Sequence, residues 1–450
     1  MIKDSILIRF LLFALLLFVV VPVWGKGNVD PKQLKGANIV IGNWWENYNT
    51  DTWKPRSDYE ERELEYRKKI QRDYGFKIQA RQIASYEQIG AVAATSTMAG
   101  KPAAQVVFLE PRVAMTMHNR RLLAPLSDSK AVDFNATDPV VWNQDVRRSF
   151  TFNNKVYAMS IGYGSSMHAQ VLYFNKRLFR EAGLDPNLPY DMQKAGTWKW
   201  DAFLEICKKL TRDINNDGII DTYAMTADLS TEILDAIVSS NGANYIDRDS
   251  RGRFVNATGR PEFLEALQFS MRLKREGVMM PEPENKAWNW YQAMFNNGRV
   301  AIRIEPHYVA GQLGNMEDDW GMVLFPMGPR AKNYVVYTDE NVMVVPSTYK
   351  GNELDKILMA VQLWFTPLDD DWKSGIYHSY RDTRAVDETV ALIRNPSLQV
   401  WKYHLFIPGL ERGDIAWAMW WHEGDPAQLV ESVEKSWNAL IDEANKIISK

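Results

Sequence analysis

Acidic residues stand close to tryptophans at several points of this 450-residue sequence, and these residue types suggest two kinds of chemistry. A pair of carboxylates can act as the acid and the base of glycoside hydrolysis. Carboxylates can equally accept hydrogen bonds from sugar hydroxyls in a site that only binds, while flat aromatic rings pack on the apolar faces of pyranose rings. Both interpretations remain open at this point. The carboxylates concerned are Glu46, Glu110, Glu305, Asp339 and Glu423.

Other common catalytic signatures are absent from the sequence. The six histidines are scattered, and no HExxH motif or Cys/His cluster is present that would bind zinc. Residues 162–166, GYGSS, do not match the GxSxG elbow of a hydrolase, and there is neither a P-loop nor a GxGxxG motif. The net charge is −3 and basic clusters are absent, so we expect no nucleic-acid partner.

Residues 211–223, TRDINNDGIIDTY, have the spacing of a calcium-binding loop. Alternate side chains can point inward, Gly218 at loop position 6 allows a sharp bend, and the next residue offers its carbonyl. Position 12 is Ala224, so the bidentate Glu of the motif is missing, and a metal-free acidic turn is the alternative. One structural calcium ion is the cofactor that this loop suggests, and we expect no other. Its candidate ligands are Asp213, Asn215, Asp217, Ile219 and Asp221.

The N-terminus has the pattern of a secretory signal peptide covering residues 1–25. Two basic residues flank the apolar run from Phe10 to Val21, and small or modest residues precede the expected cleavage after Gly25. An uncleaved signal anchor is the alternative. The single cysteine, Cys207, lies far from this site, so we do not expect a lipoprotein. Because a freely diffusing export product would be lost from a single-membrane cell, we expect the protein in the periplasm.

The first third of the chain alternates between strand and helix patterns, which predicts an α/β sheet. Ligands of such sheets bind beyond the carboxyl ends of the strands. Trp44, Trp45 and Glu46 follow the first predicted strand, and Glu110 follows the third, so these four residues are candidates for one site. The predicted elements are a strand at 37–46, a helix at 58–73, a strand at 76–80, a helix ending near 98 and a strand at 104–109.

Residues 153–184 carry a pattern that points to a known family. The segment includes Lys155, Tyr157 and the run 173–184, YFNKRLFREAGL. It resembles the family-1 extracellular solute-binding proteins of ABC sugar transporters, with their GKxYaxP and YNKxLFxxAGL motifs. Residues 295–301, FNNGRVA, and 320–326, WGMVLFP, resemble further motifs of that family. The chain differs at Asn154, at Ser160 and by Phe174 inserted before the Asn-Lys pair.

The resemblance implies a periplasmic-binding-protein-like α/β fold, with two α/β lobes, a hinge and an interlobe ligand cleft. Lobe one would comprise residues 36–157 plus 326–375, and lobe two residues 158–325 plus 376–450. It implies a monomeric protein without catalytic residues that captures a sugar or oligosaccharide by lobe closure and delivers it to an ABC permease in the inner membrane. A periplasmic glycan-degrading enzyme and a ligand sensor for a membrane receptor are the alternatives.

The cleft contacts are expected in the strand-end loops, in the crossing segment and in the aromatic cluster near the C-terminus. Glu46 and Glu110 are the strongest carboxylate candidates because they follow strands. We expect one or two of the three C-terminal tryptophans to face the ligand. The predicted ligand-binding residues are Trp44, Trp45, Glu46, Glu110, Tyr163, Glu305, His307, Trp417, Trp420 and Trp421.

Overall fold

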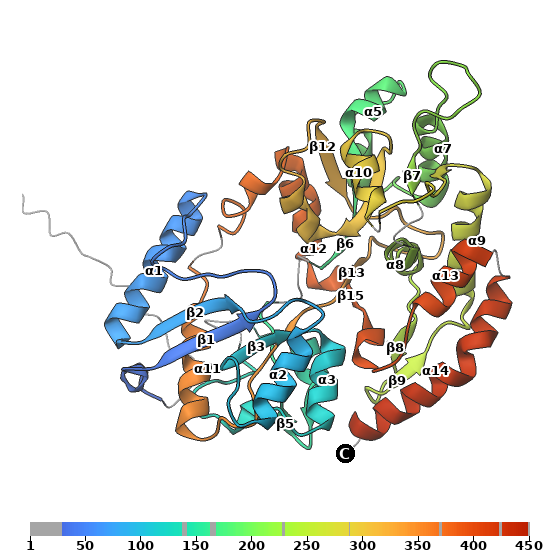
Figure 1. Ribbon diagram of the computed structural model, residues 1–450. Coiled ribbons are helices and arrows are strands. Elements are labelled where there is room, and N and C mark those ends of the chain that lie inside the picture. The colour runs from blue at the N-terminus through green and yellow to red at the C-terminus, as the bar shows by residue number, and fades with distance from the viewer. Residues whose placement is uncertain are drawn as a thin grey trace, which may run out of the picture.

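The computed structural model of the chain shows two α/β lobes, one built on a mainly parallel sheet and the other on an antiparallel sheet (Figure 1). This arrangement confirms the predicted α/β architecture. The predicted signal peptide lies outside the described residues. The structure describes residues 29–136, 142–162, 168–226, 230–287, 289–368, 371–422 and 425–448.

Lobe one is organised around the four-stranded sheet β14-β3-β1-β2. Strands β1, β2 and β3 run parallel, while β14 returns late in the chain and pairs antiparallel with β3. The first helix begins where Ser57 accepts a hydrogen bond from Glu60 N and ends at Gly75, whose φ of 65° suits glycine. Its elements are β1 (Asn38–Asn43), α1 (Asp58–Tyr74), β2 (Lys77–Gln82), α2 (Ile89–Met98), β3 (Val106–Leu109), α3 (Pro111–Asn119), β14 (Val342–Val344) and α11 (Asn352–Trp364).

Lobe two is organised around the antiparallel sheet β11-β6-β12, in which every residue of the central strand β6 is buried. Helices surround this sheet, and lobe two also contains two separate short strand pairs, β10-β7 and β8-β9 (Figure 1). Its larger elements are β6 (Gln170–Asn175), α5 (Lys176–Glu181), α6 (Leu188–Ala195), α7 (Trp200–Leu210), β7 (Met225–Thr226), α8 (Ser230–Ser240), β8 (Ile246–Arg248), β9 (Phe254–Asn256), α9 (Pro261–Arg275), β10 (Met279–Met280), α10 (Trp290–Asn296), β11 (Ile302–Pro306), the 3₁₀ helix η3 (His307–Gln312), β12 (Trp320–Val323), α13 (Gly413–His422) and α14 (Pro426–Ile448).

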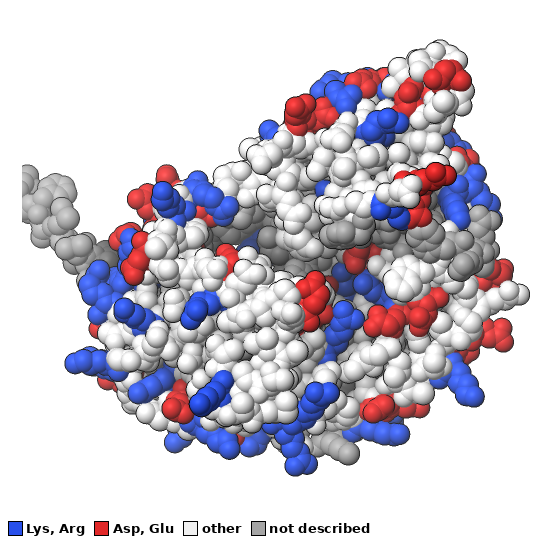
Figure 2. Space-filling model, in the orientation of Figure 1, with Lys and Arg blue, Asp and Glu red and all other residues white. Residues whose placement is uncertain are grey.

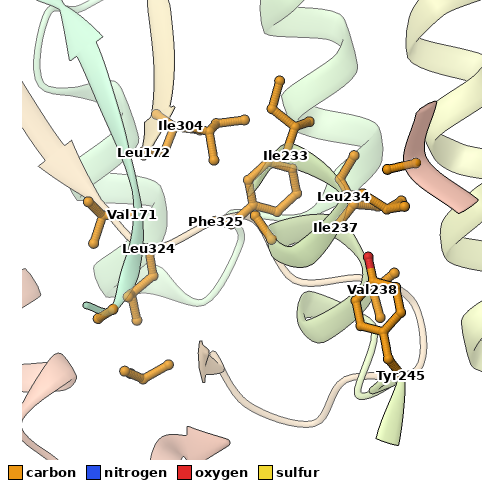
Figure 3. Close-up of a cluster of buried hydrophobic side chains, with 14 of the residues drawn as sticks. Val171, Leu172, Ile233, Leu234, Ile237, Val238, Tyr245, Ile304, Leu324 and Phe325 are labelled. Carbon is orange, nitrogen blue, oxygen red and sulfur yellow. The ribbon is translucent and has the colours of Figure 1, made fainter. Parts of the chain in front are cut away.

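The core of lobe two forms where α8 packs on this sheet. Figure 3 shows Ile233 and Ile237 of α8 beside Leu172 of β6 and Ile304 of β11. Ile233 and Ile237 are four residues apart and therefore lie on one face of α8. Each isoleucine or leucine in this group contributes roughly 1.5–3 kcal/mol when fully buried. The C-terminal helices α13 and α14 pack against α8 and β9, so they lie with lobe two although they follow lobe-one helix α11 in sequence.

Two short strands between the lobes, β13 and β15, bring together residues from distant parts of the chain. Strand β13 (Val336–Thr338) pairs parallel with β15 (Gln399–Trp401), and the register places Thr338 opposite Trp401. The residues that follow these strands are therefore brought together. The remaining elements are η1 (Pro31–Leu34), η2 (Leu126–Asp128), α4 (Gln144–Ser149), β4 (Thr151–Phe152), β5 (Lys155–Val156), η4 (Tyr377–Ser379), the π-helical η5 (Ala385–Val390), α12 (Ala391–Ile393), η6 (Pro396–Leu398) and η7 (Tyr403–Phe406).

The sheet of lobe two offers a test of its packing at Gly321 of β12. A methyl group there would overlap the buried ring of Phe174, with one ring carbon 2.6 Å away. We expect Gly321→Ala to lower the free energy of unfolding by about 1–3 kcal/mol, because neither the ring nor the strand has room to move. Gly314→Ala is the control, since no atom lies within 4 Å of its added methyl group. Equal thermal midpoints for the two variants would contradict this packing.

Candidate functional site

A cavity of about 1000 Å³ lies between the lobes. Figure 2 shows the corresponding groove between the upper and lower parts of the molecule. Lobe one contributes residues that follow β1 and β3, and lobe two contributes residues from η3, α8 and the segment that leads into α13. Asp339, Glu340 and Asn341, which connect β13 to β14, complete the lining.

The lobe-one wall is a cluster of aromatic rings. Trp44 packs edge-on against Trp45, with ring centroids 4.8 Å apart, and Tyr86 and Phe108 extend the cluster on either side. Buried Asn43 at the end of β1 accepts hydrogen bonds from the backbone N–H groups of Trp45 and Glu46, each 2.9 Å long. This turn holds the two indoles at the end of the strand, and 46% of Trp45 remains exposed.

Glu110 links this aromatic wall to lobe two. The Tyr86 hydroxyl donates to Glu110 Oε1 over 2.6 Å, and Arg112 Nε donates to Oε2 over 3.0 Å. Arg112 also reaches Glu411 of lobe two over 3.5 Å. Burial and the hydrogen bond to Glu110 both raise the pKa of Tyr86, so its hydroxyl remains a donor at neutral pH. The pair of Arg112 and Glu411 spans the two lobes at the edge of the cavity.

The floor of the cavity is a group of buried charges that we call the ionic cluster: Glu232, Asp235, Asp339, Lys402 and Arg412. Lys402 Nζ lies 3.1 Å from Asp339 and 3.9 Å from both Glu232 and Asp235. Arg412 pairs with Asp235 and lies 3.5 Å from Glu232. Only 4% of the Lys402 side chain is exposed, so its charge depends on these carboxylates for stabilisation.

Mutual stabilisation keeps most of the ionic cluster charged. Burial alone would raise the pKa of Asp339, but Lys402 and His168 outweigh it and hold that pKa far below its usual value. Burial would likewise lower the pKa of Lys402, yet the neighbouring carboxylates raise it. Asp235 differs, because burial and Glu232 raise its pKa to about 7 in spite of Arg412. The floor therefore offers polar groups whose charges are largely neutralised by one another.

His404 adds a neutral hydrogen-bonding group to this lining. Backbone contacts fix the amide of Asn244, whose oxygen accepts from the Tyr337 hydroxyl over 2.9 Å. The Tyr337 oxygen is thus left to accept from His404 Nδ1, 3.5 Å away. Burial, reinforced by Arg412 and Lys402, lowers the pKa of His404 well below its usual value. The ring is neutral, and Nε2 carries the free lone pair.

This geometry, with two lobes around a polar and aromatic cavity, is that of a binding cleft, and the sequence places it in a family. The model of the bacterial extracellular solute-binding protein family matches residues 64–366. The chain belongs to that family. It is a solute-binding protein of an ABC importer, a transport receptor without enzymatic activity. No curated protein matches the chain in sequence.

Solved structures of other solute-binding proteins share the fold at low sequence identity. The cyclic alpha-maltosyl-1,6-maltose binding protein of Arthrobacter globiformis is 15% identical, with a TM-score of 0.62, covering 90% of this chain and 99% of that chain. An ABC substrate-binding protein of Listeria monocytogenes in complex with cycloalternan is 15% identical, with a TM-score of 0.57 and coverages of 92% and 99%. The maltotriose binding protein of Thermus thermophilus, bound with maltotriose, is 17% identical, with a TM-score of 0.54 and coverages of 91% and 100%.

The solute-binding protein brings four of the sequence-predicted ligand residues to the cavity: Trp44, Trp45, Glu110 and Trp417. On α13 the buried side chains of Ala416 and Met419 share a face with Trp420, which is 5% exposed. Trp417 lies off that face, is 59% exposed and lines the cleft, while Trp420 belongs to the core.

Other predicted residues lie away from the cavity lining. Glu305 is 3% exposed and pairs with Arg303, two residues earlier on the same face of β11. His307 is 1% exposed and contacts the hydroxyl of Tyr380. Glu46 is exposed beside the aromatic wall but is not among the residues that line the cavity. Tyr163, Glu423 and the side chain of Trp421 lie outside the described residues.

Sequence reasoning missed the lobe-two floor, where Glu232, Lys402 and Arg412 line the cavity with His168. A signal was present in α8, an apolar helix that carries acidic residues at positions 232 and 235, three apart and therefore on one face. Lys402 was a second signal, because this charged residue stands between two aromatic residues, Trp401 and Tyr403. Neither signal identifies its partners, which come from distant parts of the chain.

The predicted calcium loop is a closed turn at the far side of lobe two from the cavity lining. Asp213 accepts from the backbone N–H groups of Asp217 and Gly218, and Asp221 accepts from Ile214 N over 2.7 Å. Backbone donors thus hold these carboxylates. Among the described residues, no group of three or more His, Cys, Asp or Glu side chains is placed to hold a metal ion. The calcium ion stays a prediction.

Among the described residues, no helix combines the length and the apolar character needed to cross a membrane.

Removing Lys402 tests the ionic cluster. Lys402→Met removes the cation that Asp339 shares with Glu232 and Asp235, and we expect the free energy of unfolding to fall by about 3–5 kcal/mol, the cost of breaking a buried ion pair by removing one partner. Arg272→Met is the matched control, because its pair with Asp201 is exposed and worth less than about 1 kcal/mol. Urea denaturation measures both values. A loss of less than 1 kcal/mol in Lys402→Met would contradict the proposed role of this lysine.

Thermal melting tests the Asp213 loop. If the loop binds calcium, millimolar calcium should raise the melting temperature and a chelator should lower it, with a dissociation constant of about 10⁻⁴–10⁻³ M because position 12 lacks its Glu. Asp221→Asn should abolish the shift. If calcium does not change the melting temperature of the unchanged protein, the loop is a metal-free acidic turn. Ligand affinity should not depend on calcium, because none of the loop residues lines the cavity.

Proposed function

We propose that this solute-binding protein captures a neutral sugar or oligosaccharide between its lobes and delivers it to the permease of an ABC importer. The observation that carries the proposal is the composition of the cavity, in which an aromatic wall in lobe one stands opposite a polar, ion-paired floor in lobe two. Carbohydrates have apolar ring faces and a rim of hydroxyl groups, so they need both kinds of surface.

The charges of the cavity support a neutral ligand. Its lining contains three cations, Arg112, Lys402 and Arg412, and each already pairs with at least one carboxylate. Five carboxylates line the same cavity: Glu110, Glu232, Asp339, Glu340 and Glu411. An anionic ligand would have to displace an existing ion pair, whereas hydroxyl groups can donate to the remaining lone pairs of the carboxylates.

The size of the cavity and the similar structures support a carbohydrate ligand. A volume of about 1000 Å³ is at the upper end of the range for small-molecule pockets and leaves room for more than one ring. Two of the structures that share the fold are complexes with cycloalternan and with maltotriose.

Lobe closure would connect binding to transport. A ligand that contacts both walls favours the closed form by its differential contacts, and a permease would recognise that form. Arg112 of lobe one and Glu411 of lobe two lie 3.5 Å apart at the edge of the cavity, where such a closing contact would form. The N-terminal pattern of residues 1–25 supports export to the periplasm.

The proposal is tested by titrating the purified protein with a panel of neutral glycans and their uronic-acid counterparts while recording tryptophan fluorescence. Emission should respond to the ligand because Trp44, Trp45 and Trp417 line the cavity. A neutral glycan should bind and remain intact. Binding of uronates alone, or of no glycan at all, would overturn the proposed ligand class, and turnover of a bound glycan would favour a glycan-degrading enzyme.

Trp417→Ala should weaken glycan binding by about 1–3 kcal/mol, because the exposed indole supplies stacking area at the cavity. The fold should be unaffected, since the side chain is not part of the core. Met98→Ala is the control: Met98 is also a large exposed apolar side chain, 61% exposed, but it lies outside the cavity lining. Isothermal titration calorimetry measures the affinities. Equal affinities of the two variants would contradict a role for Trp417.

A further inference from the structure

A second hollow, of about 500 Å³, adjoins the interlobe cavity on lobe two. Gln312, at the end of η3, lines both spaces. The second hollow, which we call the amide groove, lies at the end of the sheet away from the cleft, because Asn175 ends β6 and contacts its Asp318. The lining includes Arg177, Asn296, Asn297, Gln312, Asn315 and Asp318.

The floor of the amide groove is built rigidly. Arg177 donates to both oxygens of Asp318 over 2.7 and 2.9 Å, and Asn175 Nδ2 donates to the same carboxylate over 2.7 Å. The guanidinium lies against Gly298, where a Cβ atom would collide with it and would stand 2.8 Å from Asp318. The third arm of Arg177 pairs with Glu181. The one cation of the floor is therefore neutralised and fixed in place.

The walls of the amide groove consist of side-chain amides. Asn296, Asn297, Gln312 and Asn315 are exposed, and none of these four side chains hydrogen-bonds to another of the described residues. Each amide offers two donor hydrogens and a carbonyl acceptor, which matches hydroxyl groups that both donate and accept. Glu317 adds a negative charge, and Arg177 is already paired, so the groove has nothing to attract an anion.

A chain molecule could occupy the cleft and the amide groove together. Pro306 lines the cleft, and η3 leads from it to Gln312, six residues later. At about 2 Å per residue of 3₁₀ helix, the run from Pro306 to Gln312 is roughly 12 Å long. A ligand that contacts Pro306 in the cleft and also enters the groove beyond Gln312 must therefore be an oligosaccharide of several rings.

We propose that the amide groove is a further subsite, which binds the distal residues of a neutral oligosaccharide whose first residues occupy the cleft. The oligosaccharide passes over Gln312, whose side chain contacts it where the cleft meets the amide groove. The proposal rests on the proposed function, because it requires that the cleft binds carbohydrate. It adds that the ligand is extended and that one end of it leaves the cleft along the outer surface of lobe two.

The test compares short and long glycans of the same linkage. The probes are partial hydrolysates of neutral polysaccharides (starch, mannan, xylan, cellulose and mixed-linkage β-glucan), each separated into a fraction of two to three sugars and one of six to eight. The variant Asn296→Ala with Asn315→Ala removes two amides of the groove and no residue of the cleft. The control, Asn352→Ala with Gln428→Ala, removes two exposed amides elsewhere.

For the polysaccharide whose fragments bind, the long fraction should bind the unchanged protein about tenfold more tightly than the short one, as expected for two additional hydrogen bonds. The groove variant should lose this gain and keep its affinity for the short fraction, while the control should keep both. Equal binding of short and long fractions, with no effect of the groove variant, would overturn the subsite and leave the proposed function intact. No binding of any fraction would overturn both.

Discussion

The salt bridge between Lys402 and Asp339 is the interaction on which the cleft depends. Thr338 and Trp401 are opposite each other in the parallel pair β13-β15, and the backbone N–H of Lys402 donates to the Thr338 carbonyl over 3.0 Å. The next side chains along both strands, Asp339 and Lys402, are consequently held 3.1 Å apart. One strand pairing thus ties the segment that returns to lobe one to the segment that leads into α13.

The position of this bridge explains why the charges beside it are tolerated. Burying a lone ammonium or carboxylate costs several kcal/mol, and the cost is offset only where partners surround it. Glu232 and Asp235 of α8 flank Lys402 and also pair with Arg412, while Asp339 pairs with both Lys402 and His168. The result is a floor with lone pairs and N–H groups at fixed places and little net charge, which suits hydroxyl groups better than ions.

The sequence predicted the parts of this molecule that depend on local pattern. The alternation of strands and helices, with the family motifs around Tyr173, predicted the fold, and the rule that ligands bind beyond strand ends placed Trp44, Trp45 and Glu110 at the cavity. The prediction failed for Glu305, because this side chain lies on a buried face of β11 and pairs with Arg303, two residues earlier on the same strand. The ionic cluster was out of reach, since Glu232 and Lys402 are 170 residues apart (402 − 232) and nothing local to either one reveals their contact.

The two walls of the cleft are built independently of each other, and this bears on how the protein can bind. Ring contacts within lobe one hold the aromatic wall, and the ionic cluster holds the floor through lobe two and the crossing segment. Between the cavity-lining side chains of the two walls, Arg112 and Glu411 form a weak, solvent-exposed bridge. The side chains of each wall are therefore already ordered before the lobes close. Closure loses little side-chain entropy, so most of the free energy of the ligand contacts stabilises the closed form.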